Sequence, residues 1–165
     1  MNINKIFEDK KYLDQTIKFY IKKNQIKKIT KNEELVLAHL EKARHNIEFY
    51  KINKYNYKFK DWIIVILYYS LYHCALALTT NKKYQSKNHS ATILLLIKEY
   101  NLTKKEAKLI EELSINKEDA RLYTELKEHR QNASYTTSTK FTQTKIDEYE
   151  EKVIDFINKT DELIK

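Results

Sequence analysis

Apolar residues recur every three or four positions along much of this chain, which is the spacing of one face of an α-helix. In residues 33–53 this face carries Val36, Leu40, Ala43, Ile47 and Tyr50. Near the end of the chain the same spacing returns at Ile146, Tyr149, Val153, Phe156 and Thr160. Both stretches therefore predict amphipathic helices, with one side facing a core and the other facing water.

The stretch from Asp61 to Thr80 is apolar around nearly its whole circumference. A helix of this kind is usually buried on all sides, so we predict that it is the central core helix. Trp62–Leu78 is also a candidate membrane span, but it is short for one and contains Ser70 and His73. The polar, lysine-rich start lacks the apolar segment of a signal peptide. We therefore expect a soluble cytoplasmic protein with no membrane partner.

The remaining pattern predicts further helices joined by short polar connections. Residues 3–28 read as one helix, and Thr30 with Glu33 forms a capping-box pattern that opens the helix after it. A second capping box, Thr103 with Glu106, opens a short helix to about residue 113. Other helices are expected over residues 88–100, 118–133 and 142–164, with polar connections at 54–60, 81–87 and 134–144.

The composition favours an all-helical fold, because the chain has no glycine and no proline. Sheet proteins normally need glycine in their turns. Asn53, Asn81 and Asn101 are the expected left-handed residues at helix ends. The single cysteine, Cys74, excludes an intramolecular disulfide, and we expect a buried, inert thiol. The predicted fold is an all-α antiparallel bundle of four to five helices, preceded by an extra basic helix.

The net charge is +8 and is concentrated at the start of the chain. Residues 1–31 contain nine lysines against three acidic residues. One interpretation is that this segment contacts nucleic acid. The other, which we favour, is that Leu13, Ile17 and Tyr20 pack on the bundle while the lysines are solvated. We divide the chain into a basic N-terminal extension, residues 1–30, and a helical bundle, residues 31–165.

Two of the predicted buried stripes contain a polar residue. His73 lies in the middle of one stripe of the central helix, and Arg130 lies on the inward side of the predicted 118–133 helix. Because a buried polar group needs a partner or a use, these residues indicate a polar seam inside the bundle. The residues expected in the core are Val36, Leu40, Ile66, Tyr69, Ala77, Leu126, Val153 and Phe156.

Three short motifs follow one another in a fixed order. The central helix contains YYSLYHCA at 68–75, the next helix opens with NHS at 88–90, and residues 130–135 read RQNASY. With an amphipathic helix before and after them, these motifs resemble the HEPN superfamily (higher eukaryotes and prokaryotes nucleotide-binding). They are most similar to small prokaryotic members that read YYAxFHAA, His-Ser and RxxADY at these places. The resemblance covers about residues 33–162.

The resemblance implies a HEPN-like four- or five-helix bundle that is commonly dimeric. Many HEPN members are metal-independent ribonucleases or toxins. Others bind RNA or nucleotides without cleaving them, and some pair with a minimal nucleotidyltransferase. Catalytic members have an arginine followed, after four to six residues, by a histidine. Here Arg130 matches the arginine, but the following positions hold Tyr135, Thr136 and Thr137.

The motifs give a set of candidate residues. Arg130 would stabilise the charge that develops on a phosphate, and His73, His129 or Tyr135 would transfer the proton. Structural alternatives are a buried Arg130 paired with a carboxylate, a His73 satisfied within the core and a solvated His129. The candidate binding residues are Asn132, His89 and Tyr69. No metal site and no cofactor are predicted.

Two hypotheses follow. The first is an RNA-directed HEPN protein of a defence, stress or toxin–antitoxin setting, which cleaves RNA without a metal by attack of the 2′-hydroxyl on the adjacent phosphate. The second is a non-catalytic HEPN homodimer that binds RNA, a nucleotide or a protein, and the missing histidine at 135–137 motivates it. The expected partners are a second copy of the chain, RNA and a minimal nucleotidyltransferase antitoxin.

Overall fold

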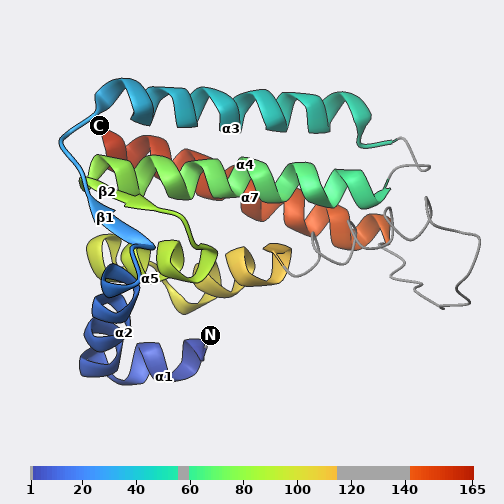
Figure 1. The fold of residues 1–165 in the computed structure, drawn as a ribbon. Coiled ribbons are helices and arrows are strands. Elements are labelled where there is room, and N and C mark those ends of the chain that lie inside the picture. Colours follow the sequence, from blue (N-terminus) through green and yellow to red (C-terminus); the bar gives the residue numbers. More distant parts are fainter. Residues whose placement is uncertain (1, 56–59, 115–141) are drawn as a thin grey trace, which may run out of the picture.

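A computed structural model describes residues 2–55, 60–114 and 142–165 (Figure 1). Its helices are α1 (Ile3–Glu8), α2 (Lys10–Lys22), α3 (Glu33–Asn53), α4 (Lys60–Asn81), α5 (His89–Tyr100) and α7 (Gln143–Ile164). Residues 104–114 form a further helical segment. Two short strands, β1 (Ile26–Lys28) and β2 (Tyr84–Ser86), pair into a small sheet. The predicted all-α fold class is confirmed.

Several predicted helix starts are confirmed by their capping contacts. The Asn88 side chain accepts from the backbone N–H of Ala91 at 3.0 Å, so α5 begins at His89. In the capping box, the Thr103 N–H donates to Glu106 at 2.8 Å and the Glu106 N–H donates to the Thr103 hydroxyl at 3.3 Å. The expected left-handed residue after α5 is also present, because Asn101 has φ 50° and ψ 43°.

The prediction of one helix over residues 3–28 was wrong. The chain breaks at Asp9, whose carboxylate accepts from the Tyr12 N–H at 3.0 Å and caps a new helix. Helix α2 then ends at Lys22, and Asn24 takes a left-handed φ of 55°. This turn redirects the chain, so Ile26–Lys28 continues as a strand instead of a helix.

Three smaller predictions were also wrong. Helix α3 is capped by Asn32, which accepts from the Leu35 N–H at 2.9 Å, and not by Thr30. Asn53 and Asn81 lie inside helices, and the left-handed residue after α4 is Lys83, with φ 64°. The expected connection at 81–87 contains β2, because its backbone pairs with β1.

Helix α3 runs antiparallel to both α4 and α7 (Figure 1). Against α7 this direction is fixed by two contacts. The Arg44 guanidinium meets the Asp161 carboxylate at 2.7 Å, and the Tyr50 hydroxyl donates to Glu150 at 2.9 Å. The later of the two α3 residues contacts the earlier of the two α7 residues, so the two helices run in opposite directions.

Helix α5 runs in the same direction as α4. The Tyr68 hydroxyl lies 3.3 Å from His89 Nδ1 near the start of α5, and the Tyr100 hydroxyl at its end donates to the Leu78 carbonyl at 3.0 Å. This arrangement requires the chain to travel back along α4 before α5 begins, and β2 makes that return (Figure 1). The return places the first residue of α5 beside the middle of α4.

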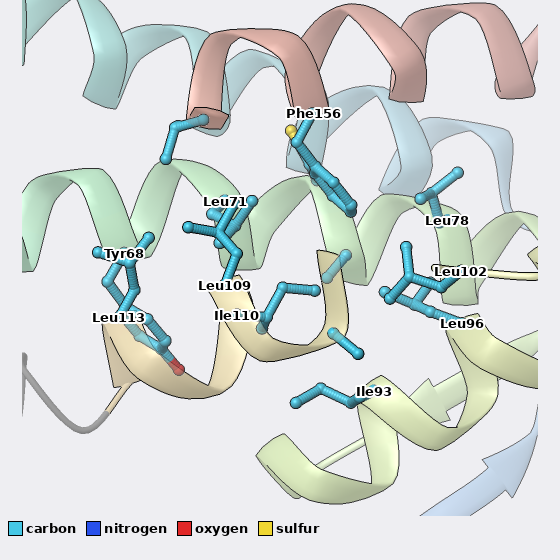
Figure 2. Packing of buried hydrophobic residues seen from close by; sticks show 14 of the residues in the cluster. Tyr68, Leu71, Leu78, Ile93, Leu96, Leu102, Leu109, Ile110, Leu113 and Phe156 are labelled. Atoms are coloured by element: carbon cyan, nitrogen blue, oxygen red, sulfur yellow. The ribbon is translucent and has the colours of Figure 1, made fainter. Parts of the chain in front are cut away.

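Helix α4 is the centre of the core, as predicted. Figure 2 shows its Leu71 and Leu78 facing side chains of α5, of residues 104–114 and of α7. Although Trp62–Asn81 is long and apolar enough to cross a membrane, 72% of that window is buried inside the structure, which fits a core helix. Cys74 is fully buried, and burial raises the pKa of its thiol to about 12.

Most of the expected core residues are buried. Tyr69 was predicted wrongly, because its side chain is 37% exposed, and Ile66 is only partly buried. These two residues lie on the side of α4 that its packed neighbours leave partly open. Leu126 is outside the described residues. The confirmed members are Val36, Leu40, Ala77, Val153 and Phe156.

The N-terminal helices pack on the rest of the fold through their apolar side. Leu13 and Ile17 of α2 belong to the same buried cluster as α4 and α5. An ion pair of 2.6 Å between Lys98 of α5 and Asp14 of α2 lies at this contact. These contacts agree with the interpretation that the N-terminal segment packs on the bundle. The division into residues 1–30 and 31–165 stays a prediction.

Substitution of Ile17 by Ala should destabilise the protein by about 2–4 kcal/mol, because the side chain is 4% exposed and its removal leaves a cavity. Ile21→Ala on the same helix is the matched control, since Ile21 is 44% exposed, and its effect should stay below about 0.5 kcal/mol. Urea unfolding measures both free energies. Equal losses in the two variants would contradict docking of α2 on the bundle.

Candidate functional site

Helix α4 presents polar side chains toward two neighbouring elements. His73 faces α3, and Tyr68 and Tyr72 face α5. At about 100° per residue, Tyr69 lies between them, roughly 40° around the helix from His73 and 60° from Tyr72. One side of α4 therefore carries a histidine pair, an exposed tyrosine and a buried aromatic cluster next to one another.

The histidine pair is formed by His39 of α3 and His73 of α4. Their Nδ1 atoms are 3.1 Å apart, and their rings are tilted by 42° with centroids at 5.3 Å. A hydrogen bond between two imidazole nitrogens needs one N–H donor and one lone-pair acceptor. In the neutral pair, one ring is therefore protonated on Nδ1 and the other on Nε2.

Both imidazoles are neutral at neutral pH. Burial, together with the neighbouring His39 and Lys42, lowers the pKa of His73 to about 4. Burial also lowers the pKa of His39. Since both side chains are only half-buried, the pair presents one Nε2 lone pair and one Nε2–H on the partly open side of α4. Such a pair can accept one proton and donate another.

No pattern in the sequence singled out His39. It lies next to the buried α3 stripe, and its role depends on which turn of α3 meets His73. That register is set by long-range packing, including the bond from the Ser70 hydroxyl to the Ala43 carbonyl at 3.2 Å. A contact map from related sequences would be the signal that could reveal it.

The second group is an aromatic cluster around His89. The rings of Tyr68 and Tyr72 stack at 5.5 Å with an angle of 13°, and the Tyr68 hydroxyl lies 3.3 Å from His89 Nδ1. The Tyr72 hydroxyl is 3.5 Å from the Thr92 hydroxyl, and burial raises the pKa of this tyrosine. The exposed Tyr69 ring packs edge-on against Tyr68 at 5.2 Å.

The structure thus brings three of the candidate residues to one side of the fold. Tyr68 contacts both Tyr69 and His89, and His73 lies one turn along α4 from Tyr69. The other four candidates, Arg130, His129, Asn132 and Tyr135, lie outside the described residues, so their placement stays a prediction.

A separate cleft of about 550 Å³ lies between residues 104–114 and α7. Among its lining residues, Lys159 and Glu106 form an ion pair of 2.6 Å. None of the described candidate residues lines this cleft. Within the described part of the chain, no three His, Cys, Asp or Glu side chains gather as a metal site. The histidine pair is therefore the stronger candidate for chemistry.

Comparison with known proteins gives one informative match. Over 66 residues the chain is 33% identical to a protein from Methanocaldococcus jannaschii named "Putative toxin MJ0142". The match covers 40% of this chain and 44% of that relative, so it spans less than half the length of either protein. No family model and no solved structure matches the chain.

The lowered pKa of His73 should make folding stability depend on pH. Between its ordinary value of 6.5 and about 4, the unfolded imidazole binds a proton that the folded one does not. Stability should therefore be complete above pH 6.5 and fall as the pH drops toward 4. The full shift corresponds to about 3 kcal/mol, and we expect about half of that because the ring is partly exposed.

Urea unfolding at pH 7 and pH 5 measures this effect. His73→Gln should reduce the loss of stability between the two pH values, because the titrating group is gone. His45→Gln, at an exposed position of α3, is the control and should keep the wild-type loss. The same pH dependence in all three proteins would contradict the burial effect at His73.

Proposed function

We propose that this chain is a toxin-type member of the HEPN superfamily that acts on RNA in the cytoplasm. Three observations support the proposal. The motifs at 68–75, 88–90 and 130–135 resemble that superfamily, the fold is an all-α bundle, and a distant relative bears the name of a toxin. An antitoxin of the minimal nucleotidyltransferase type is the protein partner we propose.

The neutral His39–His73 pair is the observation on which an enzymatic function depends. In RNA cleavage by transesterification, a base removes the proton of the 2′-hydroxyl, and its oxygen forms a bond to the adjacent phosphorus. The bond from phosphorus to the 5′-oxygen breaks, and an acid protonates that oxygen. The pair offers one lone-pair nitrogen and one N–H for these two roles.

The strength of the base limits the expected rate. A general base works best when its pKa is close to the working pH. With a pKa of about 4, His73 is a weak base at pH 7. We therefore expect slow turnover, which is best observed with protein in excess over RNA. Arg130 would stabilise the charge on the phosphate, as predicted from the sequence.

Cleavage should be tested with mixed RNAs in the presence of EDTA. We expect products with 2′,3′-cyclic phosphate and 5′-hydroxyl ends. His73→Gln and Arg130→Ala should each reduce the rate about 100-fold or more, because each removes a group that acts in the transition state.

The control for this assay is His45→Gln, which should cleave at the wild-type rate because His45 is exposed and outside the histidine pair. RNA that stays intact with the wild-type protein across all substrates would overturn the enzymatic form. Activity that persists in His73→Gln would show that other residues transfer the protons.

The second candidate function is a non-catalytic homodimer that serves as a binding or assembly module. It is favoured by exposed apolar side chains on both sides of the α3–α4 connection. Phe49 is 50% exposed, Ile52 82% and Trp62 48%. We propose that these side chains belong to one interaction surface, since contiguous exposed apolar patches mark such surfaces.

Light scattering after size-exclusion chromatography tests the dimer at micromolar concentration. The wild-type chain should elute at twice the mass of one chain, and Ile52→Glu combined with Trp62→Glu should elute as a monomer. Leu163→Glu is the matched control on α7, where the side chain is 38% exposed, and it should leave the dimer intact. A monomeric wild type would exclude the dimer.

A further inference from the structure

The pairing of β1 with β2 brings together two lysine-rich segments that are far apart in the sequence. In the antiparallel register Lys27 faces Gln85 and Lys28 faces Tyr84. Residues 22–31 and 82–88 contain no aspartate or glutamate. We name this surface the basic ribbon, and its exposed lysines are Lys22, Lys23, Lys27, Lys28, Lys31, Lys82, Lys83 and Lys87.

The ribbon is held in place by backbone bonds and by one buried side chain. The Ile29 N–H donates to the Lys83 carbonyl at 2.9 Å, and the Lys87 N–H donates to the Gln25 carbonyl at 3.0 Å. Ile26 is 1% exposed and anchors β1 in the core. The lysines therefore extend from a fixed backbone, and they reach a ligand as a preformed group.

The charge of the ribbon is poorly compensated within the described part of the chain. Of its eight lysines, Lys31 makes an ion pair, with Glu33 just outside the ribbon. The ammonium groups of Lys23 and Lys82 lie over the rings of Phe19 and Tyr100, which attract a cation without neutralising it. Concentrated like charges of this kind are stabilised by a polyanion that displaces their counterions.

The ribbon and the histidine pair both lie along helix α4. The ribbon adjoins the C-terminal end of α4 (Figure 1), and Asn81 lies eight residues beyond His73. At 1.5 Å per residue this is about 12 Å along the helix axis. An RNA strand held on the ribbon would therefore have to extend about 12 Å along α4 to reach His73.

We propose that the basic ribbon binds the phosphate backbone of single-stranded RNA and positions it for the histidine pair. This inference rests on the proposed function, because RNA is the polyanion on which that site would act. Lysine ammoniums act as point charges, so binding through them is insensitive to sequence. Phe19, which is 54% exposed beside Lys23, offers a ring on which a base can stack.

The test compares two variants of the full chain that lose the same charge. The ribbon variant replaces Lys27, Lys28, Lys83 and Lys87 by Gln. The control variant makes the same change at four exposed lysines elsewhere, Lys10, Lys11, Lys51 and Lys104. Each variant lowers the net charge from +8 by four. Equal melting temperatures in the two variants establish that both are folded.

The probe is a fluorescent 20-nucleotide RNA with 2′-O-methyl groups, which can be bound but not cleaved by attack of the 2′-hydroxyl. Fluorescence anisotropy over a range of salt concentrations gives the slope of log K against log salt. For single strands each lost phosphate contact changes this slope by about 0.7, so the ribbon variant should lose about 3. The control variant should keep the wild-type slope and affinity.

Four results would overturn the proposal. Equal weakening in both variants would mean that only overall charge matters, and unchanged slopes in both would place the RNA elsewhere. Both of these results would leave the proposed function intact, because the protein would still bind RNA. A wild-type protein that binds no RNA would overturn the proposed function as well. A competition experiment with poly-L-glutamate tests a different partner. If it displaces the RNA at equal charge concentration, the ribbon would instead bind an acidic protein.

Discussion

Helix α4 has apolar side chains on nearly every side, and most of them have to be removed from water. A single helix can be covered in this way only if several neighbours pack along it, and α3, α5, α7 and residues 104–114 do so, leaving one side partly open. Because α5 runs in the same direction as α4, the chain first has to return along α4, and β2 is that return. The small sheet is thus a consequence of the burial of α4, and so is the position of His89 beside Tyr68.

The polar residues of α4 fix how its neighbours align. A buried hydroxyl or imidazole without a partner costs free energy, so each has to meet a complementary group. Ser70 is fully buried and donates to the Ala43 carbonyl, and His73 meets His39 about one turn away. Sliding α3 along α4 by one turn would break both contacts. The same bond that satisfies His73 also fixes opposite tautomers in the two rings, so the register of the core determines the chemistry that the pair can perform.

Most features that depend on local spacing were predicted from the sequence, although the caps at Asp9 and Asn32 were missed. Features that depend on long-range contacts were not predicted. The stripes of α3 and α7 and the capping box of Thr103 with Glu106 were predicted, because they involve residues three or four apart. The strand at Ile26 was missed, because its pairing partner lies sixty residues away at Ser86. Tyr69 was misplaced for a related reason. Helical period tells which residues share a side of α4, but it does not tell which neighbour covers that side.

The low pKa of His73 also bears on how binding and chemistry would be coupled. In the free protein the half-buried ring is kept neutral by its surroundings, and Lys42 adds a positive charge that opposes protonation. A phosphate bound beside the pair would reverse that balance, because a nearby negative charge favours the imidazolium. The pKa would then move toward the working pH, where proton transfer is most effective. If RNA binds as we propose, the substrate itself would strengthen the base that acts on it, and the free protein would keep a stable, neutral contact between α3 and α4.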